Sequence, residues 1–139
     1  VGLTGQNYPA FEAYISSSPT ISTATNTVIA YDAENFDTDS AYDTSTYKFT
    51  PQTAGKYFVY AKARINSGTD SDDNEIFLFK NTTAFARIAY RHEYYDSPLI
   101  AGITTLNGST DFVLVKIYHA FGSNQTLNQA YFGAYRIGA

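Results

Sequence analysis

Two short stretches of the chain are apolar at nearly every position, and they restrict the fold more than any other feature. Residues 57–60 and 112–118 are rich in aromatic and β-branched side chains, and in the second stretch only Lys116 clearly breaks the apolar run. Such residues favour strands, and no segment carries the repeating apolar stripe of an amphipathic helix. A strand in a two-sheet sandwich needs only one apolar face. We therefore expect an all-β fold in which the second face of these strands is covered, either by a loop or by another subunit.

The remaining sequence divides into short runs of strand character separated by turn residues. The expected strands are residues 11–16, 27–31, 47–50, 56–65, 75–80, 84–91, 98–106, 111–120 and 129–137. Turn signals separate strands at 51–55, 81–83, 107–109 and 122–124, while 68–73 is expected to form an acidic turn and 32–46 a long loop with short paired pieces. A chain of 139 residues suits one domain, which we place at 9–139 after an N-terminal extension or linker at 1–8.

Composition and charge argue against several classes of function. The formal net charge is −4 and the nine Lys and Arg residues are scattered, so we expect no nucleic-acid partner. No apolar run approaches the roughly 20 residues of a membrane helix, so we expect no membrane insertion. The chain has no Cys, which excludes disulfides and cysteine nucleophiles. Its two histidines, His92 and His119, lie in no catalytic motif and are expected at a surface or an interface, so we do not expect an enzyme.

A regular spacing of aromatic and turn residues occupies the stretch 31–61. It is kept without a gap by Tyr31, Asp37, Tyr42, Phe49, Gly55, Tyr57, Val59 and Ala61. This pattern resembles the signature of the complement C1q-like globular head. Five positions carry a residue type that the signature allows, while Tyr31, Val59 and Ala61 depart from it without adding charge. The pattern also has a physical basis, because Gly55 suits a turn with positive φ before a strand that buries alternate side chains.

The resemblance extends towards both ends of the chain. Residues 9–14 look like the first strand of the C1q-like family, and residues 131–135 look like its last. The residue pattern at 36–47 looks closer to domains of tailed-phage virion proteins than to those of animal complement proteins. Animal relatives normally carry a collagen stalk, and the chain has no Gly-X-Y repeat. The resemblance implies a two-sheet jelly-roll β-sandwich of about ten antiparallel strands, related to the tumour-necrosis-factor fold. It also implies a homotrimer that presents loops at one end to a partner.

The doubly apolar strands are expected to form both the core and the contact between sister subunits. Tyr suits such a contact because it combines a flat apolar ring with a polar tip. The expected core and trimer-interface residues are Tyr57, Phe58, Tyr60, Phe112, Val113, Val115, Ile117, Tyr131 and Tyr135.

Polar loops are the expected place for an outside partner. Aromatic rings stack on sugar rings, and the candidate residues near loops are His92, Tyr94, Tyr95 and Phe121. Three Asn-X-Ser/Thr triplets also lie in expected turns, and they begin at Asn81, Asn107 and Asn124. We interpret them as turn residues rather than as glycan sites.

The acidic stretch around Asp72 leaves two alternatives open. Asp70, Asp72 and Asn74 place oxygens at alternate positions, and some members of the C1q-like family carry calcium near the trimer apex. However, Glu75 occupies the place where a calcium-binding hand needs Gly, and Asn81 replaces its terminal Glu. We expect no resident cofactor, and these residues either bind calcium or form a solvated acidic turn.

Three functions fit these observations. The first is a trimeric virion component, either a fibre knob that attaches to a host surface glycan or protein, or a decoration of a capsid or tail among other virion proteins. The second is a secreted or cell-surface C1q-like recognition lectin, and the third is a sugar-active enzyme on a jelly roll. The first two predict a location on the virion surface or outside the cell. The third needs a pair of carboxylates facing a cleft, for which the sequence offers little.

Overall fold

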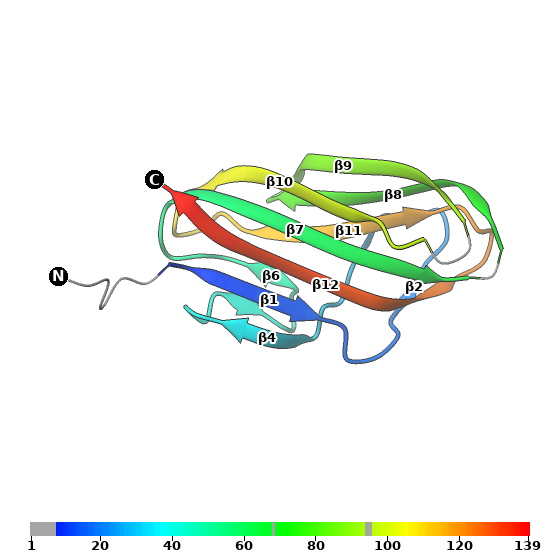
Figure 1. The fold of residues 1–139 in the computed structure, drawn as a ribbon, viewed down its shortest axis with the longest axis horizontal. Helices are drawn as coiled ribbons and strands as arrows, with labels where there is room; N and C mark the ends of the chain where they lie inside the picture. Colours follow the sequence, from blue (N-terminus) through cyan, green and yellow to red (C-terminus); the bar gives the residue numbers. More distant parts are fainter. Residues whose placement is uncertain (1–7, 68, 94–95) are drawn as a thin grey trace.

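The computed structural model describes residues 8–67, 69–93 and 96–139, and the regular structure in these ranges is β-strand (Figure 1). The strands are β1 (Ala10–Tyr14), β2 (Thr20–Ile21), β3 (Thr27–Val28), β4 (Ala33–Asp37), β5 (Tyr42–Asp43), β6 (Lys48–Phe49), β7 (Gly55–Asn66), β8 (Ser71–Lys80), β9 (Thr83–His92), β10 (Leu99–Leu106), β11 (Val113–His119) and β12 (Gln125–Gly138). Within the described ranges, no helical segment with the length and hydropathy of a membrane span is found.

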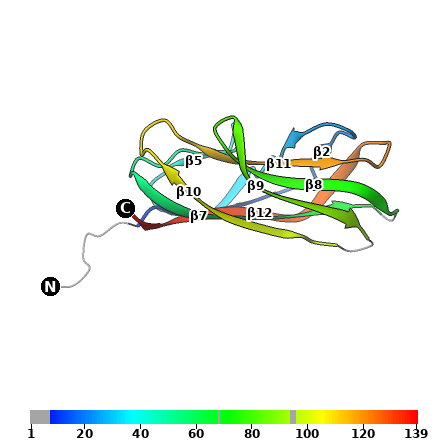
Figure 2. The ribbon, with the colours of Figure 1, turned by 90° about the horizontal axis from the view of Figure 1, so that it is seen from above.

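The strands form two antiparallel sheets that lie face to face (Figure 2). The first, called here the β7 sheet, has the order β10-β7-β12-β1-β4, with β2 paired to β12. The second, called the β11 sheet, has the order β5-β6-β11-β8-β9, with β3 paired to β11. The all-β class and the two-sheet jelly-roll sandwich are therefore confirmed. The strands number twelve in the described residues rather than about ten, because four of them are two-residue pairings within residues 20–49.

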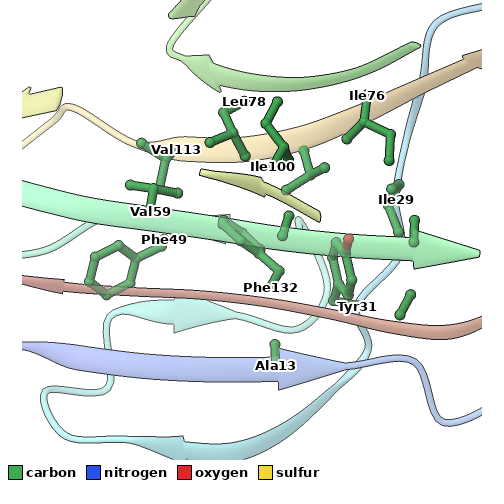
Figure 3. Close-up of a cluster of buried hydrophobic side chains, with 14 of the residues drawn as sticks. Ala13, Ile29, Tyr31, Phe49, Val59, Ile76, Leu78, Ile100, Val113 and Phe132 are labelled. Atoms are coloured by element: carbon green, nitrogen blue, oxygen red, sulfur yellow. The ribbon is translucent and has the colours of Figure 1, made fainter. Parts of the chain in front are cut away.

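The core fills the space between the two sheets. In β7 the burial alternates strictly, so that Tyr57, Val59 and Ala61 point inward and are fully buried. Figure 3 shows Val59 and Phe132 of the β7 sheet in one cluster with Leu78 and Val113 of the β11 sheet. Removing apolar surface from water contributes about 25 cal/mol per Å² to the free energy of folding, so this cluster is the main source of stability.

Aromatic rings make up one part of the core. The ring of Phe11 stacks against Tyr42 and Phe49, with centroid distances of 4.7 and 4.4 Å, and Phe132 meets it edge-on at 4.9 Å. Offset stacked and edge-on pairs are the favourable ring geometries. Residues from β1, β5, β6 and β12 are thereby joined across both sheets.

The spaced residues of the 31–61 stretch meet in this part of the core. Asp37 Oδ2 accepts the backbone N–H of Tyr42 at 2.8 Å, and the Tyr42 hydroxyl donates to the Tyr31 carbonyl at 2.7 Å. Tyr31 donates its own hydroxyl to the Lys62 carbonyl at 3.2 Å. Gly55 adopts φ +154, and a Cβ there would lie 2.3 Å from the Gly138 carbonyl oxygen. The spacing therefore reflects contacts that these residues make with one another and with neighbouring strands.

The expected acidic turn at 68–73 is wrong at its C-terminal end. Strand β8 begins at Ser71, so Asp72 and Asp73 belong to it. The ladder with β9 extends as far as the pair Ser71 and His92, and Arg91 Nε of β9 lies 2.8 Å from Asp72 Oδ1.

The last strand also begins earlier than expected. Strand β12 starts at Gln125 rather than at Gln129, and its register against β7 shifts between Asn128 and Tyr131. Gln129 has φ 53, which marks a β-bulge at that point. The bulge interrupts the alternation of apolar residues, and this is why the sequence pattern ends there although the pairing continues.

Candidate functional site

The outer face of the β7 sheet carries an unusual number of exposed apolar side chains. Phe58 of β7 pairs with Ile103 of β10 on one side and with Tyr135 of β12 on the other. The rings of Phe58 and Tyr135 are 5.3 Å apart, and Ile103 is 57% exposed while Tyr135 is 45% exposed. Apolar surface therefore runs without a break across three neighbouring strands.

Further residues extend this surface over the whole sheet. We call it the aromatic face and define it by Tyr14, Phe36, Phe58, Tyr60, Leu99, Ile103, Tyr131, Tyr135 and Ile137. Among the described residues, six of the seven exposed large apolar side chains belong to it. Contiguous apolar patches of this kind mark interaction sites on soluble proteins.

Tyr60 and Glu12 form the polar centre of the aromatic face. Gly133 of β12 lies between their strands, and a Cβ at Gly133 would fall 2.3 Å from the Tyr60 hydroxyl oxygen, so the Tyr60 side chain lies directly over this glycine. The Tyr60 hydroxyl donates to Glu12 Oε2, and Asn35 Nδ2 donates to Glu12 Oε1 at 2.9 Å. Each carboxylate oxygen thus has a donor, which lowers the free energy required to cover this charge with another surface.

The protonation of Tyr60 fits its role as a donor. Burial is the main cause that raises the pKa of Tyr60, and its hydrogen bond to Glu12 raises the pKa further. The hydroxyl therefore keeps its proton at neutral pH. At one side of the face, Lys62 Nζ lies 5.7 Å from the centre of the Tyr131 ring and supplies a charged edge.

The outer face of the β11 sheet is covered by its own side chains. Lys116 Nζ lies 4.4 Å above the Phe79 ring, and Lys48 Nζ lies 4.3 Å above the Phe112 ring. Leu114, which also points outward, is only 6% exposed. The β11 sheet therefore presents charged groups over its apolar surface, and the β7 sheet is the better candidate for a protein contact.

This architecture matches solved structures in shape. The globular domain of zebrafish complement 1qA is 16% identical, with a TM-score of 0.65, over 94% of this chain and 98% of that chain. Murine APRIL is 14% identical, with a TM-score of 0.68, over 94% and 100% of the two chains. The PRD1 vertex protein P5 is 10% identical, with a TM-score of 0.69, over 94% of this chain and 73% of that chain. The chain has the C1q/TNF-like jelly-roll fold.

The similarity is one of structure. No family model and no curated protein sequence matches the chain. The C1q/TNF-like fold confirms the resemblance that the 31–61 stretch indicated. At sequence identities of 10 to 16%, the similarity shows only that the fold is shared. The function has to be argued from the residues of this chain.

The structure places eight of the nine expected core and interface residues in two groups, with Phe112 apart from both. Tyr57, Val113, Val115 and Ile117 are buried between the sheets and are core residues. Phe58, Tyr60, Tyr131 and Tyr135 lie on the aromatic face. Phe112 is half-buried under Lys48. The second face of β7 is thus open, whereas that of β11 is covered within the chain.

Several members of the aromatic face were not foreseen from the sequence. Phe36 and Tyr14 are single large apolar residues on the outer side of their strands, and Leu99 and Ile103 are four positions apart in β10. A single exposed apolar residue carries no signal, since most protein surfaces are more than half apolar. Only the register of five strands shows that these residues are neighbours.

Of the residues expected to contact an outside partner, the structure places His92 in the interior and leaves Phe121 half-buried. His92 is fully buried, because it ends β9 on the side that faces the other sheet, and its ring meets the half-buried Phe121 at 5.1 Å. Tyr94 and Tyr95 lie outside the described residues. His119 is also fully buried rather than at a surface, with Nε2 3.1 Å from the Ile21 carbonyl and Nδ1 accepting the Phe121 N–H at 3.4 Å.

The structure does not gather the expected calcium ligands on one side. Asn74 is buried and donates from Nδ2 to the Ser71 carbonyl at 3.0 Å, whereas Asp72 is exposed and paired with Arg91. A register shift between Ser71 and Asn74 separates the two side chains. In the described part of the chain, no group of three or more His, Cys, Asp or Glu is close enough to hold a metal ion.

Proposed function

We propose that this chain is a non-enzymatic module that forms a homotrimer through the aromatic face. The observation that carries the proposal is the continuous apolar surface around Phe58, Ile103 and Tyr135 on the outside of the β7 sheet. Interface cores are enriched in Tyr and Phe and depleted of unpaired charge. The satisfied Glu12 carboxylate meets the second condition.

The proposed setting is a virion surface, with the chain acting as a fibre knob or as a decoration of a capsid or tail. Two features support it. The residue pattern at 36–47 resembles that of tailed-phage virion proteins, and the fold is similar to that of the PRD1 vertex protein P5. The module would then contact other virion proteins and a host surface. A secreted or cell-surface recognition protein is the second candidate, favoured by the similarity to the complement 1qA globular domain.

Multi-angle light scattering tests the trimer. The chain of 15.3 kDa is expected to elute with three times this mass at micromolar concentration. Ile103→Lys and Tyr135→Lys change exposed residues and are expected to give folded monomers, because each places a charge inside the proposed contact. Ala89→Lys, an exposed position in the β11 sheet, is the matched control and should leave the trimer intact. A wild-type chain that is monomeric at this concentration would refute the proposal.

A further inference from the structure

Two groups of opposite charge lie on the outer side of the β7 sheet without a counter-ion in their own chain. Glu12 of β1 and Lys62 of β7 are both half-buried, and both point away from the core. Neither side chain forms an ion pair with another described residue. The aromatic face therefore carries one carboxylate and one ammonium group whose charges are not compensated within the described part of the chain.

The carboxylate of Glu12 keeps its charge although both of its oxygens are hydrogen-bonded. Its donors are the Tyr60 hydroxyl and the Asn35 side-chain amide, and both are neutral groups. Burial, followed by the contact with Glu12, raises the pKa of Tyr60, so the proton stays on Tyr60. Neutral donors lower the cost of covering the carboxylate, but they leave its negative charge uncompensated.

Lys62 lies on the same face two strands away from Glu12, on the far side of β12 (Figure 1). Lys62 pairs with Tyr131 and Tyr131 pairs with Tyr14, so Glu12 is displaced from the level of Lys62 by two residues along β1. The usual spacing of strands and rise per residue put the two Cα atoms roughly 12 Å apart. Lys62 Nζ lies 5.7 Å from the centre of the Tyr131 ring. The ammonium group is therefore held against the apolar surface and does not reach Glu12 of its own chain.

We propose that Lys62 of each copy forms an ion pair with Glu12 of the next copy, and this inference rests on the proposed homotrimer. A partner on the aromatic face would cover both charges, and a covered charge is strongly unfavourable unless it is paired. A second copy supplies both the missing cation and the missing carboxylate on one apolar surface. In a three-fold ring every contact is head-to-tail, so each copy offers Lys62 to one neighbour and Glu12 to the other. The ion pair would fix the register of the subunits, which apolar contacts alone specify weakly.

The two other outward cations of β7 are placed less favourably for this pairing. Lys62 is two residues from Tyr60 along the strand, whereas Lys56 and Arg64 are each four residues from it, towards opposite ends. Lys56 is exposed, and its Nζ donates to the Ala139 carbonyl oxygen at 2.9 Å. Lys62 is therefore the cation of β7 nearest to the centre of the aromatic face, and Lys56 and Arg64 provide matched controls.

A double-mutant cycle on the trimer tests the ion pair. Glu12→Gln, Lys62→Gln and the double variant are compared with the wild type by analytical ultracentrifugation at pH 7, with circular dichroism to confirm folding. Each single substitution should weaken each contact about tenfold, and because a trimer has three such contacts its overall dissociation constant should rise about a thousandfold. The double variant should be no weaker than either single variant, because the second substitution removes a partner that is already unpaired. Lys56→Gln and Arg64→Gln should instead combine additively with Glu12→Gln.

Cross-linking of the wild-type chain identifies which copies supply the two residues. A carbodiimide joins a carboxylate directly to an amine in contact with it, so trimers reassembled from isotope-labelled and unlabelled chains should give linked peptides of Glu12 and Lys62 with mixed isotope composition. A trimer in which the substitutions are additive, or in which the link forms only within single chains, would overturn the ion pair and leave the trimer standing. A dimer with the mixed link would refute the trimer alone, whereas a monomeric wild type would refute both.

Discussion

The hydroxyl of Tyr60 donates a hydrogen bond to the carboxylate of Glu12 across the bare backbone of Gly133. The contact joins β7 to β1 over the intervening strand β12. It holds the Tyr60 ring against the sheet, and it places a satisfied polar pair at the centre of an otherwise apolar surface. The position of the Tyr60 ring on the aromatic face therefore depends on the absence of a side chain at Gly133.

Gly133→Ala is expected to destabilise the chain by about 1–3 kcal/mol and to dissociate the trimer. The new methyl group would meet the Tyr60 ring and the Phe11 carbonyl oxygen, which lies 2.9 Å from the Cβ position. Chemical unfolding and light scattering measure the two effects. Gly138→Ala in the same strand is the control, because no atom lies within 4 Å of its Cβ position. A Gly133→Ala trimer of wild-type stability would contradict the assigned geometry.

Asn107→Ala is expected to lower the free energy of unfolding by about 1–2 kcal/mol. Asn107 Oδ1 accepts the backbone N–H groups of Ser109, Thr110 and Asp111 at 3.0, 3.0 and 2.9 Å, so it closes the connection between β10 and β11. This is the turn role expected for the Asn-Gly-Ser triplet. Asn107→Asp keeps the acceptor and should recover most of the loss in moderate salt, measured by urea unfolding. Equal stability of the alanine variant and the wild type would show that the turn closes without this side chain.

Much of the fold could be predicted because its signals are local. Tyr31, Tyr42 and Phe49 are large apolar residues at fixed distances along the chain, and the buried contacts that they make explain that spacing. In β7 every second residue from Tyr57 to Ile65 is apolar, and Gly55 marks the start of this strand. The prediction was less accurate at Gln129, where a bulge interrupts the pattern, and at Asp72, where the pairing of β8 with β9 extends into the expected turn.

The candidate site was only partly predictable for a related reason. The sequence shows that β7 and β11 each have two apolar faces, but it does not show which second face stays open. Lys116 and Lys48 cover the rings of β11 and its neighbours through contacts with Phe79 and Phe112, which come from distant parts of the chain.

The stability of the chain is expected to fall in acid partly through Asp43. Hydrogen bonds from the Ser45 hydroxyl and the Ser45 N–H, followed by those from Thr46, lower the pKa of Asp43 from 3.8 to about 2. A depressed folded pKa means that the stabilisation is complete above the unfolded pKa and is lost as pH falls from about 5 towards 2. Asp43→Asn should therefore show a smaller loss of stability over this window, followed by urea unfolding with circular dichroism. Asp73→Asn is the control, and identical pH slopes for both variants would exclude the Asp43 contribution.

Two tyrosines with buried hydroxyl groups allow a direct test of hydrogen-bond satisfaction in this fold. Tyr42 donates its hydroxyl to the Tyr31 carbonyl at 2.7 Å, whereas the Tyr90 hydroxyl has no partner among the described residues. Tyr42→Phe leaves a buried carbonyl without that donor and should lower the free energy of unfolding by about 1–3 kcal/mol, while Tyr90→Phe removes only an unsatisfied group and should not. Both are measured by urea unfolding at one protein concentration, because trimer formation would make stability depend on concentration. Equal losses in the two variants would mean that the Tyr90 hydroxyl also has a hydrogen-bond partner.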